Sequence, residues 1–108
     1  MTRAEFFAAL QLSGYPTCYR EFKSPPGSKP WVCWLETSAD PEPSDDVTTV
    51  MIQTVHVELY TETKDPTAEA AIEGILTDLE IPFSKSETSL DKEACILIIY
   101  EMEVLFNG

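Results

Sequence analysis

The sequence has little of what catalytic and metal sites usually require. It contains one histidine, His56, and three widely spaced cysteines, Cys18, Cys33 and Cys95. A zinc site needs clustered Cys or His ligands, and an enzyme nucleophile needs a base beside it. We therefore predict no catalytic residues, no metal site and no cofactor, and we interpret the cysteines as buried, reduced thiols. An enzyme that uses His56 is the weaker alternative.

Basic residues are also scarce. Seven Lys and Arg stand against nineteen Asp and Glu, which gives a formal net charge of −12. This balance argues against binding to nucleic acid or to an anionic membrane by the isolated domain. No apolar run is long enough to cross a bilayer, and the first residues lack the pattern of a signal peptide. We expect a protein of a reducing compartment that has no membrane contact.

The length of 108 residues predicts a single domain, 1–108, that can bury a core without disulfides. Two helices are expected. Thr2 and Glu5 form a capping box that opens a helix over residues 3–12. Asp65 and Pro66 open a second helix that runs to Glu80, with Glu69 off its apolar side. Its apolar stripe consists of Ala68, Ala71, Ile72, Ile75, Leu76 and Leu79.

The remaining apolar segments predict strands. They are residues 15–22, 31–35, 47–60, 83–90 and 94–106. The first two are expected to form a hairpin with a long loop, and residues 83–90 to form an edge strand. Val50 and Ile52 are out of phase with Val55, which predicts a bulge or twist near Gln53 and Thr54 that turns them inward. The expected fold is α+β: a mainly antiparallel sheet with two helices packed on one face and long inserted loops.

Two inserted loops, at about 24–30 and 37–46, are expected to be mobile. The first contains three prolines, and the second is acidic and lacks a base. The candidate contacts to other subunits or partners are Pro25, Pro26, Lys29, Trp31, Asp40, Glu42, Asp45 and Asp46. Residues 27–29 lack the glycine-bracketed spacing of a phosphate-binding loop. Weak calcium binding by the acidic loop is a minor alternative, because its spacing is not that of an EF-hand.

The second half of the chain resembles a known group of proteins. The segments that carry the resemblance are Val57–Thr61, Lys64–Pro66 opening a helix, Ile81–Phe83 followed by Lys85–Thr88, and Ile99–Glu101. Together they resemble small structural proteins from the neck of tailed bacteriophages, in the tail-terminator (tail-completion, or head–tail joining) group. The resemblance covers about residues 47–106.

The resemblance implies an α+β fold without catalytic residues and a virion protein assembled in the host cytoplasm. It also implies a homo-oligomeric ring, of hexameric type, that caps the tail tube and contacts the tail tube protein and a head-completion protein. Genomic DNA would pass through the lumen without specific binding. The alternative from another class is a small acidic inhibitor that mimics DNA and blocks a host nuclease.

Overall fold

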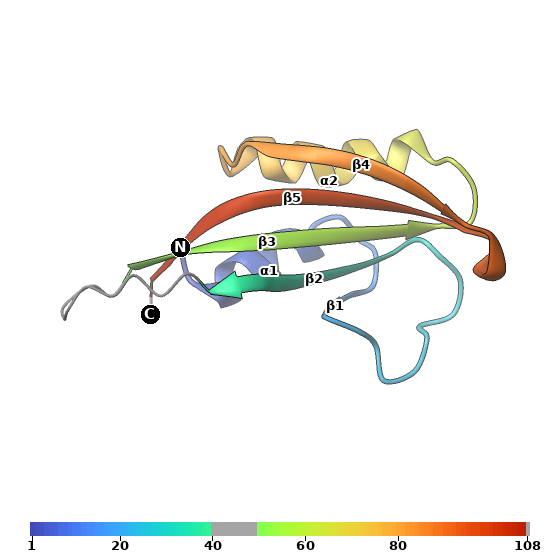
Figure 1. The fold of residues 1–108 in the computed structure, drawn as a ribbon, viewed down its shortest axis with the longest axis horizontal. Coiled ribbons are helices and arrows are strands. Elements are labelled where there is room, and N and C mark those ends of the chain that lie inside the picture. Colours follow the sequence, from blue (N-terminus) through green and yellow to red (C-terminus); the bar gives the residue numbers. More distant parts are fainter. Residues whose placement is uncertain (40–49, 108) are drawn as a thin grey trace.

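The computed structural model describes residues 1–39 and 50–107. The elements in chain order are α1 (Arg3–Gln11), β1 (Thr17–Tyr19), β2 (Trp31–Ala39), β3 (Val50–Thr61), α2 (Pro66–Asp78), β4 (Phe83–Leu90), the 3₁₀ helix η1 (Asp91–Glu93) and β5 (Cys95–Asn107). Figure 1 shows the five strands as one sheet. The prediction of an α+β fold with a mainly antiparallel sheet is confirmed.

The sheet has the strand order β1-β2-β3-β5-β4. Its centre is the long antiparallel pair β3 and β5, which runs in unbroken register from Val50 opposite Asn107 to Thr61 opposite Ile96. Strand β4 lies outside β5, as predicted for an edge strand. The neighbouring pair β2 and β3 is also antiparallel. Two central strands of this length give the molecule its long axis (Figure 1).

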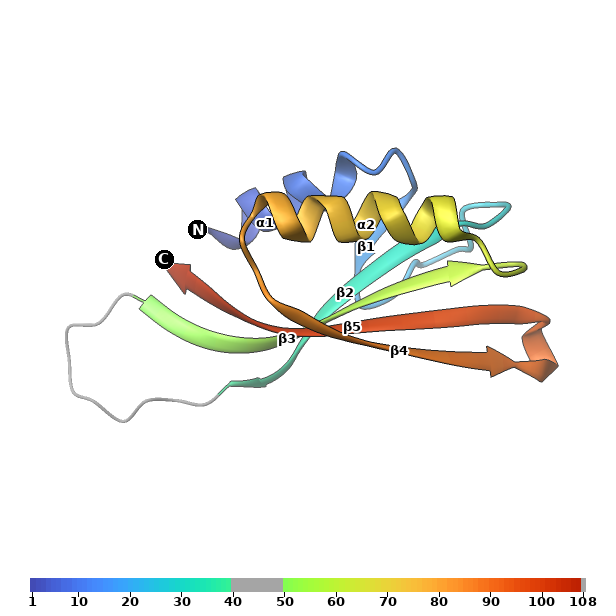
Figure 2. The same ribbon diagram turned by 90° about the horizontal axis from the view of Figure 1, so that it is seen from above.

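Both helices lie on the same side of the sheet (Figure 2). The core forms between them and alternate residues of the three inner strands, because successive residues of a strand point to opposite faces. Fully buried side chains in this layer include Phe6 and Leu10 of α1, Ile72 of α2, Val57 of β3 and Ile98 of β5. The opposite face of the sheet carries no helix in the part of the chain that is described.

The helix ends follow the sequence signals. Thr2 accepts a hydrogen bond from the Glu5 amide at 3.1 Å, and the Glu5 carboxylate accepts one from the Thr2 amide at 2.7 Å. Asp65 accepts from the Ala68 amide at 3.1 Å, and Pro66 occupies the first turn of α2. The stripe of α2 is graded, since Ala68, Ile72 and Leu76 are fully buried whereas Ala71, Ile75 and Leu79 are half-buried.

The predicted hairpin between residues 15–22 and 31–35 is wrong. β1 has only three residues and pairs with β2 in parallel, with Cys18 beside Cys33. Arg20 has a φ of +70°, which takes the chain out of the extended conformation directly after β1. Residues 20–30 contain no helix or strand and return the chain to the end of the sheet at which β1 began, so that β2 runs parallel to it.

The boundary of the acidic loop is also corrected. Residues 37–39 belong to β2, and the remainder, with Asp40, Glu42, Asp45 and Asp46, lies outside the described residues. Pairing with β3 continues to Ala39, opposite Gln53. The Glu36 side chain is held at the start of this extension by Arg3 of α1, whose Nε and Nη2 donate to the carboxylate at 2.7 and 3.0 Å.

The expectation that a bulge or twist in β3 turns Ile52 inward is wrong as well. β3 stays regular, and the register shift lies instead in β2, between Glu36 and Ser38. The alternation set by Val55 therefore continues without a break. It buries Gln53, which is 1 % exposed, and leaves Ile52 on the opposite face, 50 % exposed. Thus the hydrophobic side chain that was expected in the core lies at the surface.

Candidate interaction surface

The face of the sheet opposite the helices, here called the open face, is covered by no helix or strand within the described residues (Figure 2). Residues paired across strands share a face, so the register identifies its members. On the three inner strands they are Trp31, Cys33, Leu35, Ile52, Thr54, His56, Glu58, Tyr60, Leu97, Ile99, Glu101, Glu103 and Leu105. This set combines apolar side chains with carboxylates and includes no lysine or arginine.

An aromatic cluster occupies one end of the open face. The Trp31 ring lies 6.0 Å from that of Phe22 in the β1–β2 loop and 6.2 Å from that of Tyr60 on β3, measured between centroids. Lys29 Nζ lies 4.7 Å from the centre of the Trp31 ring, close enough for a cation–π interaction. A shallow pocket lies between Pro25 and Tyr60. The loop is therefore packed against the sheet through its aromatic side chain.

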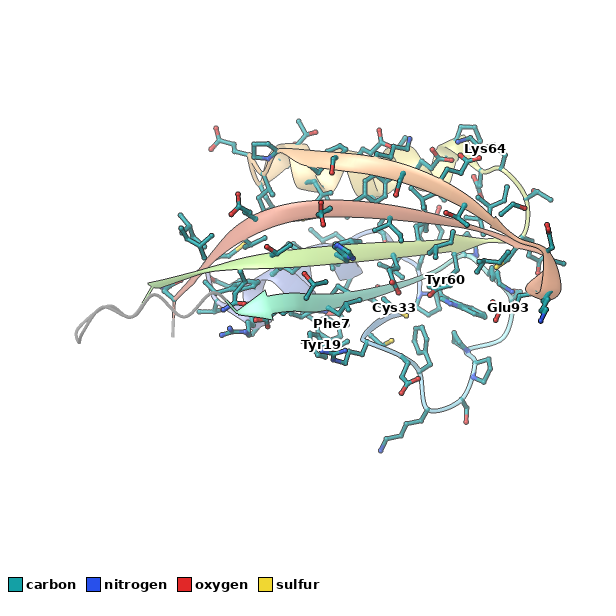
Figure 3. The ribbon with its side chains drawn as sticks, in the orientation of Figure 1. Phe7, Tyr19, Cys33, Tyr60, Lys64 and Glu93 are labelled. Carbon is teal, nitrogen blue, oxygen red and sulfur yellow. The ribbon has the colours of Figure 1, made fainter. Side chains whose placement is uncertain are left out.

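Figure 3 shows Cys33 and Tyr60 beside each other on neighbouring strands, close to this loop. Burial raises the pKa of Tyr60, and the charge of Glu58 acts in the same direction. The Tyr60 hydroxyl donates to Glu58 Oε1 at 3.1 Å, so the tyrosine is a neutral hydrogen-bond donor at physiological pH. The cluster thus presents uncharged rings and one ammonium group.

Basic side chains are concentrated in the same loop. Arg20 and Lys23 are exposed, and Lys29 is half-buried beside Trp31. Pro25 and Pro26 are exposed between them. We call the set of Arg20, Lys23, Pro25, Lys29 and Trp31 the loop patch. It includes three of the eight predicted contact residues, and another of them, Pro26, lies next to Pro25.

The other end of the open face is apolar and acidic. Ile52 and Leu105 are direct partners across β3 and β5, and they are 50 % and 56 % exposed. Glu101 and Glu103 precede Leu105 on the same face of β5. We call these four residues the acidic patch. A shallow hollow beside it is lined by Thr54, Glu101 and Glu103 and by the start of β4.

His56 lies at the middle of the open face. Its Nε2 is 2.9 Å from Glu101 Oε2, and the register places Leu35 on its other side. Glu101 is its one side-chain hydrogen-bond partner among the described residues. This pairing orients His56 along the sheet.

Sequence reasoning found only part of this surface. It identified Pro25, Pro26, Lys29 and Trp31 as candidate contacts, and Trp31 lies on the open face whereas Trp34 is buried on the helix side. It missed the acidic patch, because the alternation of Glu101 and Glu103 with Met102 and Val104 is the ordinary pattern of a strand with one exposed face. The exposed pair of Ile52 and Leu105 depends on the register between two distant strands.

A second polar cluster, on the helix side of β4, was also missed. Glu69 of α2 is 5 % exposed, and its carboxylate contacts Lys64 Nζ at 2.8 Å and Lys85 Nζ at 2.6 Å. Figure 3 shows Lys64 at the end of the sheet next to α2. Lys64 also pairs with Glu87, and Lys85 with Glu73. This cluster joins α2 to β4 and is a structural contact.

No group of three or more potential metal ligands occurs within residues 1–39 and 50–107. No helix in this part of the chain is long and apolar enough to span a membrane. Comparisons of the chain with protein-family models and with curated proteins find no match.

Proposed function

We propose that this chain is a structural subunit of a phage virion, a tail terminator that forms a ring at the head–tail interface. The ring would cap the tail tube and join it to head-completion proteins. The proposal rests on the resemblance of residues 47–106 to the neck proteins and on the arrangement of the open face. One face of the sheet is packed against both helices, and the other offers apolar and charged side chains for contact (Figure 2).

The observation that carries the proposal is the separation of two patches of different charge: the loop patch, which lies in and beside the β1–β2 loop at one end of the open face, and the acidic patch at the other end. The basic loop patch adjoins Tyr60, whereas the acidic patch surrounds Ile52, eight residues away along β3. At about 3.3 Å per residue this separation is roughly 26 Å. A patch that binds a different patch on the next copy gives a head-to-tail contact, and such contacts close into rings when the rotation allows.

The contact would combine charge with apolar burial. Lys23 and Lys29 would face Glu101 and Glu103 of the neighbouring copy, while Pro25 and Trp31 would cover Ile52 and Leu105. Charge complementarity fixes the register of such an interface, and desolvation of the apolar side chains supplies most of its free energy. The net charge of −12 also suits a lumen through which DNA passes without binding, because like charges repel.

The test is to determine the assembly state and then the location of the protein. The purified protein at moderate salt is examined by light scattering after size exclusion and by negative-stain electron microscopy, and labelled protein is located in virions. We expect closed rings of about six subunits at the head-proximal end of the tail. A protein that stays monomeric, is absent from virions and binds a basic host nuclease would overturn the proposal in favour of the DNA-mimic inhibitor.

A further inference from the structure

Two of the three thiols lie side by side on the open face. Cys18 and Cys33 are in-register neighbours on the parallel strands β1 and β2, and their Sγ atoms are 3.4 Å apart. Cys33 is 4 % exposed, whereas Cys18 is half-buried rather than buried as predicted. None of the three cysteines is in a disulfide. Neighbouring strands hold their Cα atoms within the range of separations that a disulfide bridges.

We propose that Cys18 and Cys33 form a dithiol site that is converted to an intramolecular disulfide by exchange with a small-molecule disulfide of the glutathione type. The inference stands on the geometry of β1 and β2 and does not depend on the proposed ring. The two Sγ atoms are already in van der Waals contact, so the disulfide bond can form with only a small movement of the side chains. The site is therefore preorganised for the second, intramolecular step of the exchange.

The exchange takes place in two balanced steps. The Cys18 thiolate attacks one sulfur of oxidised glutathione, the S–S bond of that molecule breaks, and one glutathione leaves as a thiolate. The Cys33 thiolate then attacks Cys18 Sγ of the mixed disulfide, and the second glutathione leaves. Two protein thiols lose two protons and two electrons, and one glutathione disulfide is reduced to two thiols. Cys18 reacts first because it is the more exposed of the pair.

The surroundings slow the first step without blocking it. Burial raises the pKa of the Cys33 thiol and also that of Cys18, although the contact with Cys33 lowers the latter in part. The carboxylates of Glu21 and Glu58, the charged groups nearest the pair, act in the same direction as burial. Only the thiolate is nucleophilic, so the rate of exchange should rise as the pH is raised above 8.

Cys95 provides an internal control. Register places Cys33 opposite Glu58 and Glu58 opposite Ile99, which is four residues along β5 from Cys95. That distance along the strand is about 13 Å, far beyond the reach of a disulfide without movement of the backbone. Cys95 is also 3 % exposed, so oxidised glutathione should reach it only after unfolding.

The disulfide would attach β1 to β2 at the base of the β1–β2 loop. β1 has three residues and pairs with no strand other than β2 within the described residues, so it is the strand least supported by neighbours. Cross-linking positions fifteen residues apart restricts the unfolded chain, which should raise the midpoint of thermal unfolding by on the order of 10 °C.

The experiment uses the full native chain. It is incubated with oxidised glutathione at mildly alkaline pH, the remaining thiols are blocked with an alkylating reagent under denaturing conditions, and the tryptic peptides are analysed by mass spectrometry. The three cysteines fall in three different peptides, residues 4–20, 24–64 and 93–108, because trypsin does not cut before Pro30. We expect a 4–20 to 24–64 linked pair, with alkylation of Cys95 alone.

Variants separate the site from general oxidation. Cys95→Ser should retain the linked pair and the rise in unfolding temperature, whereas Cys18→Ser and Cys33→Ser should lose both. A stable mixed disulfide of glutathione on Cys18, a link to Cys95, or a link between two chains would each overturn the proposal. Because the mass analysis is made on the native chain, its result stands even if a serine variant fails to fold.

Discussion

At the scale of single residues, Glu69 is the most constrained charge in the described structure. Its carboxylate is buried between α2 and β4 and receives hydrogen bonds from Lys64 and Lys85. Burial alone would raise the pKa of Glu69, but the hydrogen bonds and charges of these lysines reverse the effect and lower it. The carboxylate is therefore ionised and paired at neutral pH. Loss of that charge would leave two ammonium groups without their shared partner.

We predict that Glu69→Gln lowers the free energy of unfolding by about 1–3 kcal/mol at pH 7, because a buried charge-assisted pair is lost. The pKa of Glu69 is lower in the folded than in the unfolded state. The stabilisation that the Glu69 carboxylate provides is therefore fully present at a pH above its pKa in the unfolded state. It disappears as the pH falls through its pKa in the folded state. Urea unfolding between pH 3 and 7 should show the two proteins converging in acid.

Glu62→Gln is the matched control, since Glu62 is exposed just after β3. Its free energy of unfolding should lie within about 0.5 kcal/mol of that of the native protein at every pH. Equal stability of Glu69→Gln and the native protein at pH 7 would contradict this prediction. It would mean that water replaces the carboxylate as the partner of the two lysines at no cost in stability. Part of the acid sensitivity should survive in Glu69→Gln, because Lys85 and Tyr100 also lower the pKa of Glu73.

At the scale of secondary structure, substitutions in α2 test which side of the helix faces the sheet. Ile72 is fully buried against the sheet, whereas Ile75 is half-buried at the margin of the stripe. We predict that Ile72→Ala lowers the free energy of unfolding by about 2–5 kcal/mol and that Ile75→Ala lowers it by clearly less. Denaturant unfolding of both variants measures the difference. Equal losses would mean that α2 is rotated relative to the packing described.

The helices and long strands could be predicted from the sequence because their signals are local. Thr2, Asp65 and the apolar stripe of α2 determine where the helices begin and which side faces the sheet. The direction of β1 could not be predicted in this way. It depends on the left-handed conformation of Arg20 and on pairing with β2 across an irregular loop, and neither leaves a periodic pattern.

The same limit applies to the functional surfaces. Lys29 and Trp31 were recognised because they lie in and next to the Pro-rich loop, whose prolines are a local signal. The dithiol site was not, because fifteen residues separate Cys18 from Cys33 in the sequence and only the parallel register brings their sulfur atoms together. Likewise Glu69 has the spacing of a solvent-facing residue on a helix, and its contacts with Lys64 and with Lys85 of β4 explain its burial.

At the scale of the whole molecule, the two patches of the open face predict a charge-exchange experiment. Lys23→Glu with Lys29→Glu should weaken ring assembly by at least about tenfold, because the loop patch would then repel the acidic patch of the next copy. Adding Glu101→Lys and Glu103→Lys should restore much of the loss. Sedimentation velocity over a range of protein concentrations measures both effects.

Lys92→Glu is the control for net charge, since Lys92 lies in η1, outside both patches. It adds negative charge without changing either patch and should weaken assembly far less. If rings form but all these variants assemble like the native chain, the patches are not the contact while the ring itself stands. If the native chain forms no ring, the proposed function fails before the patches are tested.

Salt should strengthen assembly of the native chain, because two electrostatic effects of different range compete in the ring. The net charge of −12 on each copy repels its neighbours over tens of ångströms, whereas the attraction between the patches acts within a few ångströms of contact. The Debye length falls from about 30 Å at 0.01 M salt to about 8 Å at 0.15 M, so added salt removes the long-range repulsion first. We therefore expect more ring in sedimentation velocity at 0.15 M than at 0.01 M salt. Rings that dissociate steadily as salt is added would show instead that the attraction between the patches outweighs the repulsion between whole subunits.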